Sequence, residues 1–333
     1  MKYQQFGPSG VSISRVTLGA MDFPNKMRSD EARRVIDEAI DHGVNVIDTA
    51  DSYGNSQKVI GRVLSKAQRN RVFVATKVHR QLCRDRHAAR CSRVNIIDSL
   101  DRSLAQLRVD DVDLFQLHHP DPQTPLDETL RALDDLVKAG KTRYIGLSNH
   151  YAWHVAWTVT EAKRLGLTRP ISLQAGYSLL YRQPEREVAP MLEKLNLGYM
   201  VYGPLSRGLL AGKFHDDQGR LTVDPSQRKL RPVFGPVGEV DRLDPLVQEL
   251  RRSAESLQLT AAQLAIAWIL SRPWVTTVLV GGSSPQRFPP MYAAADAEVP
   301  PEVIERLDEL SAHRAPEKYH NKPFAAGPGL PAP

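Results

Sequence analysis

Short apolar runs alternate with longer stretches of helical periodicity from about residue 16 to residue 300. Eight of the runs have the length and the β-branched content of strands, at residues 16–19, 44–49, 72–77, 112–118, 143–147, 171–174, 199–202 and 276–280. Between the runs, apolar residues recur three and four positions apart, as Val94, Ile97 and Leu100 do, which is typical of one helix face. Strands that are apolar throughout are covered on both faces, as in a parallel sheet.

Each predicted strand is followed by helical sequence. The helices are expected at residues 30–42, 58–67, 94–107, 126–139, 153–165, 185–195, 246–257 and 261–270. Ser29 is the expected N-cap of the first helix, and Gly140 is expected to end the fourth. Eight such βα units predict a (β/α)8 TIM barrel of the α/β class. A doubly wound sheet is the alternative, but it would normally carry GxGxxG after its first strand, and that motif is absent here.

Three segments lie outside this repeat. The first 15 residues, with Gly7-Pro8-Ser9-Gly10 as a turn, predict an N-terminal β-hairpin. The long connection after the seventh strand, residues 206–243, is predicted to be a functional flap. Residues 315–333 contain five prolines and two glycines and predict a loosely ordered tail, so we expect a single barrel domain over residues 1–314.

Composition narrows the class of protein but does not decide its function. A hydrophobic fraction of 41% and a charged fraction of 25% are ordinary for a globular chain. No run reaches the about 18 apolar residues of a membrane span, and the first ten residues lack the apolar stretch of a secretory leader, so we expect a cytoplasmic protein without a membrane partner. The net charge of +6 is compatible with a nucleic acid or with a small anionic ligand.

Polar, aromatic or backbone-exposing groups close seven of the eight predicted strands. They are Asp48, Lys77, His118, Ser148-Asn149, Gln174, Tyr202 and Gly281-Gly282-Ser283-Ser284. In a barrel these groups converge at the carboxyl ends of the strands, where the active sites of such barrels lie. The sequence therefore predicts one active site built from several strands.

Four of these residues fit a proton transfer. A tyrosine has a pKa of about 10, and an ammonium group nearby lowers it, while a carboxylate holds the ammonium in place. Tyr53, Lys77 and Asp48 match these three parts, and His118 could orient a carbonyl oxygen. Such a site suits the reduction of a carbonyl group by hydride, because the oxygen that gains charge needs a proton.

Five motifs stand out along the chain, namely GVNVIDTADSYGNS (43–56), VFVATKV (72–78), VDLFQLHHPD (112–121), RYIGLSN (143–149) and VYGPLSRGLLAGK (201–213). With these motifs the sequence resembles the aldo-keto reductase superfamily over about residues 1–285. The resemblance implies an NAD(P)H-dependent oxidoreductase that reduces an aldehyde or ketone, with Asp48, Tyr53, Lys77 and His118 as the catalytic tetrad and Tyr53 as the general acid. The implied substrate pocket consists of Tyr53, His118 and His119.

The resemblance also implies a set of cofactor-binding residues. Ser148, Asn149 and Gln174 would hold the nicotinamide carboxamide, and Tyr202 would stack on its ring. The pyrophosphate would lie under residues 205–213, and the adenosine end would lie near residues 282–287, with Arg287 facing a 2′-phosphate. The full expected set is Ala20, Met21, Asp48, Ser148, Asn149, Gln174, Tyr202, Gly203, Pro204, Leu205, Arg207, Gly208, Leu210, Lys213, Gly282, Ser283, Ser284 and Arg287. We expect NADPH to be preferred over NADH.

The chain departs from the family pattern at two places. The usual Ser-Glu after the tyrosine is Ser56-Gln57 here. The family's adenine-binding Glu-Asn lies on a helix, whereas this chain has Pro289-Pro290-Met291, and two prolines are expected to disrupt a helix interior. Recognition of the adenine is therefore open.

Other reactive residues have ordinary interpretations. His118 and His119, as neighbours on a strand, are expected to point to opposite faces, and His150 and His154 lack a third ligand, so no metal site is expected. Cys83 and Cys91 are expected to be ordinary thiols.

The loop after the third strand is unusually basic. It has five arginines and one acidic residue, namely Arg80, Arg84, Arg86, Arg90 and Arg93 with Asp85. It is either a solvated loop or a site that recruits an anionic substrate such as a nucleotide-linked keto sugar. It lacks interleaved aromatic residues, so no nucleic-acid partner is expected. The oligomeric state is open.

Two other functions compete with reduction. One is a cofactor-sensing regulatory subunit of the same fold, since some members of the family attach to ion channels. The other is a Schiff-base enzyme that uses Lys77 as the nucleophile, which the neighbouring Asp48 disfavours because it keeps the lysine charged.

Overall fold

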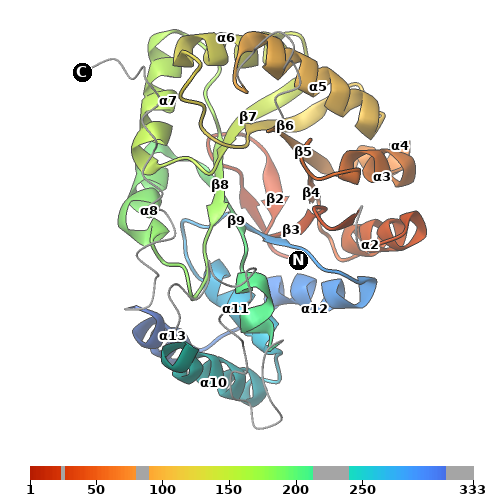
Figure 1. Ribbon diagram of the computed structural model, residues 1–333. Coiled ribbons are helices and arrows are strands. Elements are labelled where there is room, and N and C mark those ends of the chain that lie inside the picture. Colours follow the sequence, from red (N-terminus) through yellow and green to blue (C-terminus); the bar gives the residue numbers. More distant parts are fainter. Residues whose placement is uncertain (24–26, 80–89, 213–239, 313–333) are drawn as a thin grey trace.

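A closed barrel of eight parallel strands forms the centre of the molecule in a computed structural model, as Figure 1 shows. The structure describes residues 1–23, 27–79, 90–212 and 240–312, the last range without the side chains of 240–242. The strands follow the order β10-β3-β4-β5-β6-β7-β8-β9. Their bounds are β3 (Val16–Gly19), β4 (Val46–Asp48), β5 (Phe73–Val78), β6 (Val112–Leu117), β7 (Thr142–Ser148), β8 (Ser172–Gly176), β9 (Gly198–Tyr202) and β10 (Thr277–Val280). The prediction of a (β/α)8 barrel is confirmed, and closure rules out a doubly wound open sheet.

Helices surround the barrel. They are α2 (Ser29–Asp41), α3 (Ser56–Val63), α4 (Lys66–Arg69), α5 (Arg93–Leu107), α6 (Leu126–Lys138), α7 (Ala152–Arg164), α8 (Pro184–Leu195), α10 (Val240–Ser256), α11 (Ala261–Leu270), α12 (Phe288–Ala293) and α13 (Pro301–Ser311). Three 3₁₀ turns complete the described elements: η2 (Ser206–Ala211), η3 (Pro285–Arg287) and η4 (Ala294–Asp296). Among the described residues, no helix has the length and apolar character needed to cross a membrane.

Several helix ends differ from the sequence prediction. Ser29 is not the N-cap of α2: the helix already includes it, and Arg28 is the N-cap, with its backbone N–H donating to Glu31 Oε2 at 2.8 Å. The helix expected over residues 58–67 is two helices, because Ser65 starts α4 with its own capping box to Gln68. Gly140 does end α6, since it adopts the left-handed φ of 72° that favours glycine.

The two prolines after the last strand do not disrupt a helix. Pro289 and Pro290 lie in the first turn of α12, which begins at Phe288. A backbone N–H in the first turn has no acceptor within its own helix, so proline loses nothing there. The expectation of a disrupted helix is wrong. The difference from the family pattern is confined to side chains, because Pro289-Pro290-Met291 stands where the family has its Glu-Asn pair.

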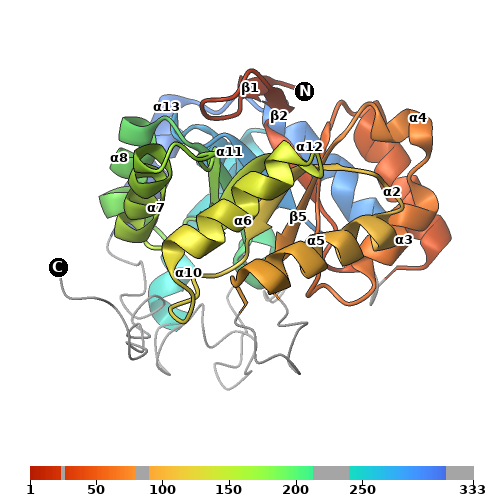
Figure 2. The same cartoon turned by 90° about the horizontal axis from the view of Figure 1, so that it is seen from above.

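The inside of the barrel is apolar at the amino ends of the strands. The buried side chains that fill it are Val46, Phe73, Ala75, Leu114, Met200 and Leu279, together with Phe6 and Ile13 from the predicted hairpin. This hairpin is confirmed: β1 (Tyr3–Gln5) pairs antiparallel with β2 (Ser12–Ser14), and it lies across one end of the barrel in Figure 2. Gly7 allows this close fit, because a Cβ there would lie 2.3 Å from the carbonyl oxygen of Ile171. The barrel is thus plugged at its amino end.

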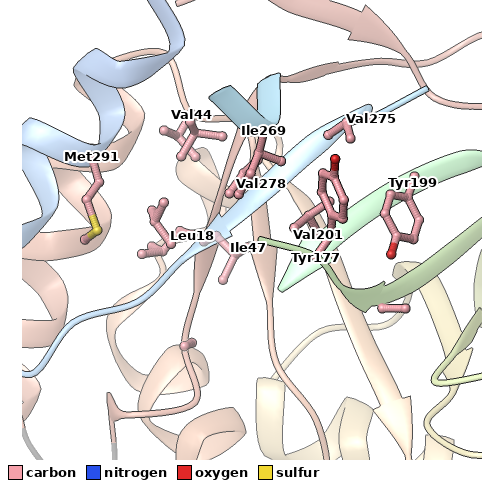
Figure 3. Close-up of a cluster of buried hydrophobic side chains, with 14 of the residues drawn as sticks. Leu18, Val44, Ile47, Tyr177, Tyr199, Val201, Ile269, Val275, Val278 and Met291 are labelled. Atoms are coloured by element: carbon pink, nitrogen blue, oxygen red, sulfur yellow. The ribbon is translucent and has the colours of Figure 1, made fainter. Parts of the chain in front are cut away.

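A second apolar layer separates the strands from the helices. Leu18, Ile47 and Val278 point outward from their strands, toward Ile269 of α11 and Met291 of α12 (Figure 3). Since side chains alternate between the two faces of a strand, the same strands also supply inward-facing residues. At the carboxyl ends, those inward positions carry the predicted site. The tail at 315–333 and most of the predicted flap, residues 213–239, lie outside the described residues.

Candidate active site

A buried ion pair lies at the carboxyl ends of β4 and β5. Asp48 ends β4, and Lys77 faces inward because it lies two and four residues beyond the inward-facing Ala75 and Phe73. Lys77 Nζ is 2.5 Å from Asp48 Oδ1, and it also donates to the carbonyl oxygen of Thr49 at 2.9 Å. Its third partner is the hydroxyl of Tyr53 at 3.4 Å. All three protons of the ammonium are therefore directed at oxygen atoms.

The electrostatics of this group favour a protonated tyrosine and a charged lysine. Burial lowers the pKa of Lys77, but Asp48 and then Tyr53 oppose that effect, and the net result is a raised pKa. Burial raises the pKa of Tyr53, and the charge of Lys77 only partly offsets this. The expectation that Lys77 lowers the pKa of Tyr53 is thus right for the contribution of Lys77 and wrong for the net result. The hydroxyl keeps its proton at neutral pH.

His118 lies beside this tyrosine as a neutral imidazole. The two rings meet edge to face, with centroids 5.6 Å apart, and Ser52 Oγ lies 3.5 Å from His118 Nδ1. Burial first, and then the charge of Lys77, lowers the pKa of His118 to about 2. A neutral imidazole can still donate one hydrogen bond, so His118 can orient an oxygen without carrying charge.

Two further histidines join this ring, and one of them was not predicted. The rings of His118 and His119 are stacked, 4.9 Å apart at 10°, so the expectation that they point to opposite faces is wrong. The reason is that β6 ends at Leu117, and both histidines belong to the turn that follows. His79 lies 5.1 Å from His118 and 5.0 Å from His119. Its position two residues after Lys77 was the signal in the sequence, because alternation places it on the same side as Lys77.

The other oxygen of Asp48 has two amide donors. Gln174 Nε2 lies 2.9 Å from Asp48 Oδ2, and Gln116 Nε2 lies 3.3 Å from the same atom. Gln174 belongs to the expected cofactor set, and the structure places it against Asp48. Gln116 was not predicted, although its position two residues before His118 in an apolar strand was the available signal.

The residues expected around a nicotinamide do come together. Asn149 has a left-handed φ of 59°, and its Nδ2 donates to the carbonyl oxygen of His118 at 2.9 Å. The hydroxyl of Tyr202 donates to Asn149 Oδ1 at 2.7 Å, while the residue as a whole remains 36% exposed. Ser148 Oγ accepts from Asn149 at 3.1 Å. The partly exposed Tyr202 and the left-handed backbone at Asn149 thus lie next to the buried ion pair.

The turn after β9 has an unusual backbone. Ser206 and Arg207 have φ values of 46° and 61°, and Gly203 and Gly208 have 69° and 100°. Left-handed conformations cost free energy in residues other than glycine, and they collect at ligand sites. This turn runs through η2, with Leu210 buried and Arg207 exposed, whereas Lys213 lies outside the described residues.

The remaining cofactor candidates lie at the same end of the barrel. Ala20 N–H donates to the carbonyl oxygen of Asp48 at 2.9 Å, and the neighbouring Met21 is 56% exposed. Gly282 follows β10 and packs against Phe288, and the side chain of Arg287 is exposed at the end of η3.

The other reactive residues take ordinary places where they are described. Cys91 is buried, and burial raises the pKa of its thiol. His150 and His154 lie 4.9 Å apart, and no group of residues that could hold a metal ion occurs among the described residues.

Of the five arginines after β5, only two are described. Arg93 Nη1 pairs with Asp135 Oδ2 at 2.5 Å, so it belongs to the packing of α5 against α6. Arg90 is exposed, and its charge helps to lower the pKa of His119 to about 4, after burial and His79. Arg80, Arg84, Arg86 and Cys83 lie outside the described residues.

The family follows from comparison with known proteins. The family model for the Aldo/keto reductase family matches residues 15–312. The chain belongs to this family. An uncharacterized oxidoreductase of Bacillus subtilis (strain 168) is 29% identical over 96% of this chain and 99% of its own length. A versiconal hemiacetal acetate reductase of Aspergillus parasiticus is 29% identical over 93% of this chain and 96% of its own length.

A third relative has a different kind of name. A probable voltage-gated potassium channel subunit beta of Arabidopsis thaliana is 30% identical over 96% of this chain and 100% of its own length. The family model covers most of the chain, so the name of this relative does not change the family to which the chain belongs. Aldo-keto reductases are oxidoreductases that generally use nicotinamide cofactors to reduce carbonyl groups.

Proposed function

We propose that this aldo-keto reductase uses NADPH to reduce an aldehyde or ketone to the alcohol, with Asp48, Tyr53, Lys77 and His118 as its catalytic residues. The observation that carries the proposal is the chain of contacts from Asp48 through Lys77 to the hydroxyl of Tyr53, at 2.5 Å and 3.4 Å. A carboxylate, a charged lysine and a protonated tyrosine in this order make a proton donor whose phenolate is stabilised by the charge of the lysine.

The cofactor residues fit a dinucleotide. Tyr202 is partly exposed beside Asn149. The turn from Ser206 to Gly208 has the left-handed backbone that is common at anion-binding turns, which suits a pyrophosphate. The exposed guanidinium of Arg287 suits a 2′-phosphate, which favours NADPH over NADH. When bound, the reduced nicotinamide supplies the hydride.

The chain's own residues then do the following. His118, neutral because of its burial, donates a hydrogen bond that holds the substrate carbonyl oxygen near Tyr53. The hydroxyl of Tyr53 gives its proton to that oxygen as negative charge develops there, and Lys77 stabilises the phenolate that remains. Asp48 keeps Lys77 charged and in place. The protons of Lys77 are already committed, so it stays a positioning charge rather than a nucleophile.

The test is Tyr53→Phe, with Tyr144→Phe as a matched control. Tyr144 also faces the barrel interior, but it stacks on Phe73, 6.3 Å away, near the plugged end. We expect Tyr53→Phe to abolish NADPH oxidation with a reactive aldehyde while the Kd for NADPH, measured by fluorescence quenching, changes little. Tyr144→Phe should retain turnover. Retained turnover in Tyr53→Phe refutes the assignment.

A second candidate function is a cofactor-sensing regulatory subunit. It is favoured by the relatives named as potassium channel β subunits, which are 29% and 30% identical to this chain. The same aldehyde assay on the unmodified protein separates the two: a subunit that only senses the cofactor binds NADPH without turning over.

The Schiff-base alternative is weaker. Its nucleophile would have to be a neutral Lys77, whereas the pKa of Lys77 is raised by its partners against the opposing effect of burial. Borohydride trapping of a substrate on Lys77 is the observation that would restore this alternative.

A further inference from the structure

The carboxylate of Asp48 needs more than one partner, because it is only 1% exposed. Its Oδ1 accepts from Lys77, and its Oδ2 accepts from the amides of Gln174 and Gln116. An unsatisfied oxygen on a buried carboxylate is costly, and the cost is relieved when the carboxylate takes up a proton. The proton nearest to Asp48 is on Lys77, only one hydrogen bond away.

Gln116 is placed for this one contact. It is fully buried near the carboxyl end of β6, and its Oε1 has no hydrogen-bond partner among the residues that the structure describes. A carboxylate can only accept hydrogen bonds, so the nitrogen end of the amide must face Asp48 and the oxygen end must be the one left over. Leaving a buried amide oxygen without a partner costs free energy, which indicates that the contact of Nε2 has a use.

The neighbouring strand makes room for this side chain. Gln116 is opposite Gly146 in the register of β6 and β7. A Cβ at Gly146 would lie 3.1 Å from Cγ of Gln116 and 2.8 Å from Oγ of Ser172. The glycine therefore leaves space for an amide in a layer that is otherwise filled by tight packing.

We propose that Gln116 is a positioning residue that keeps the Asp48–Lys77 pair in its ionic form. Together with Gln174 it supplies the hydrogen bonds that Oδ2 of Asp48 needs in this buried position. Without Gln116, the proton moves from Lys77 Nζ to Asp48, the pair becomes a carboxylic acid beside a neutral amine, and the positive charge that stabilises the Tyr53 phenolate is lost. The inference rests on the proposed reductase function for its kinetic effect, but the ionic state of the pair can be measured without turnover.

Two substitutions separate this role from packing. Gln116→Met keeps the shape and removes the donor, whereas Gln116→Glu keeps the shape and, when protonated, still donates to Asp48. The carboxyl group of Gln116→Glu keeps its proton because two close carboxylates disfavour joint ionisation. We expect kcat to fall about tenfold to a hundredfold in Gln116→Met, which is the usual effect of a lost hydrogen bond to a charged group, and to stay near that of the unmodified protein in Gln116→Glu. If Gln116 only fills space, the order is reversed: Gln116→Met is tolerated and Gln116→Glu is not.

The pH dependence of kcat adds a readout that a packing defect does not change. Without a charged Lys77, the pKa of Tyr53 rises further, so the decline of kcat at high pH moves to higher pH in Gln116→Met. The matched control is Gln57→Met. Gln57 is equally buried, and its amide donates to Thr76 Oγ1 at 2.7 Å and Ser103 Oγ at 3.0 Å, away from Asp48. This control should lower stability without moving the pH profile.

Infrared spectroscopy of protein labelled with ¹³C at the aspartate carboxyl groups tests the ionic form directly. In spectra recorded near pH 8, we expect Gln116→Met to show a protonated-carboxyl band that the unmodified protein lacks. Adding Asp48→Asn to Gln116→Met should remove this band. Absence of the band in a folded Gln116→Met protein overturns the inference even if the protein proves not to be a reductase. The converse outcome is that the band appears in Gln116→Met although the unmodified protein shows no turnover. That result supports the inference and counts against the proposed function.

Discussion

Two buried histidines should make the fold sensitive to mild acid. His150 follows β7, and His154 lies in the first turn of α7. Their ring centroids are 4.9 Å apart, and His150 Nδ1 donates to the carbonyl oxygen of Ser148 at 2.7 Å. Burial, with the neighbouring His154 as the next cause, lowers the pKa of His150 to about 3, and burial lowers the pKa of His154 to about 4. An unfolded histidine titrates near 6.5.

The sign and the size of the effect follow from these values. Above pH 6.5 both rings are neutral in the folded and the unfolded chain, so they do not penalise folding. As the pH falls from 6.5 toward 4, the unfolded chain binds two protons that the folded chain does not, and the folded state loses stability. Each histidine contributes about 1.4 kcal/mol per pH unit over this window, so the pair contributes about 3 kcal/mol per unit.

The perturbation is the double variant His150→Asn/His154→Gln, which removes both titrating rings and keeps polar side chains. Urea unfolding at steps between about pH 7.5 and pH 4.5 gives the free energy of unfolding at each pH. The slope with pH should be about 3 kcal/mol per unit smaller in the double variant, while His118 and His119 contribute equally to both proteins and cancel. His42→Gln, at an exposed site, serves as the control. Equal slopes in the double variant and the unmodified protein would refute the reasoning.

Two backbone positions give further predictions. In Gly61→Ala the new Cβ would lie 2.3 Å from the carbonyl oxygen of Gln106, so the helices α3 and α5 must separate; we expect a loss of about 1–3 kcal/mol, visible as a lower Tm in calorimetry, and an unchanged Tm would show that the contact relaxes freely. Arg207→Gly removes the strain of a left-handed residue at φ 61°; we expect the cofactor-free protein to gain about 1 kcal/mol in chemical unfolding while NADPH binds more weakly in a titration. A less stable Arg207→Gly protein would contradict the first part, and unchanged NADPH binding would contradict the second.

Much of the fold and of the site follows from local pattern. The eight apolar runs predict the barrel that the structure contains. The rule that active sites lie at the carboxyl ends of the strands predicts that Asp48, Lys77 and Gln174 come together. Alternation along a strand also predicts which neighbours share a face. The residue two positions after Lys77 is His79, and the residue two positions before His118 is Gln116, so alternation points to both of these site residues.

What local pattern did not provide depends on where elements end and on burial. The rings of His118 and His119 stack because β6 stops one residue before them, and strand ends are the least certain feature of a sequence prediction. The same uncertainty applies to Pro289 and Pro290, because a proline that would disrupt the interior of a helix is tolerated in its first turn, where both of these lie. The net pKa of Tyr53 required knowing that burial outweighs Lys77, which only the packed structure reveals.

The hairpin that plugs the barrel makes the molecule one-sided. Phe6 and Ile13 close the amino end, so a polypeptide joined ahead of β1 would leave from the face opposite Tyr53 and Tyr202. Protein tethered to a solid support through that end would therefore keep its site directed toward the solution. For the same reason, a fusion partner joined ahead of β1 would leave the substrate's path to the site open, whereas one joined near the carboxyl ends of the strands would block it.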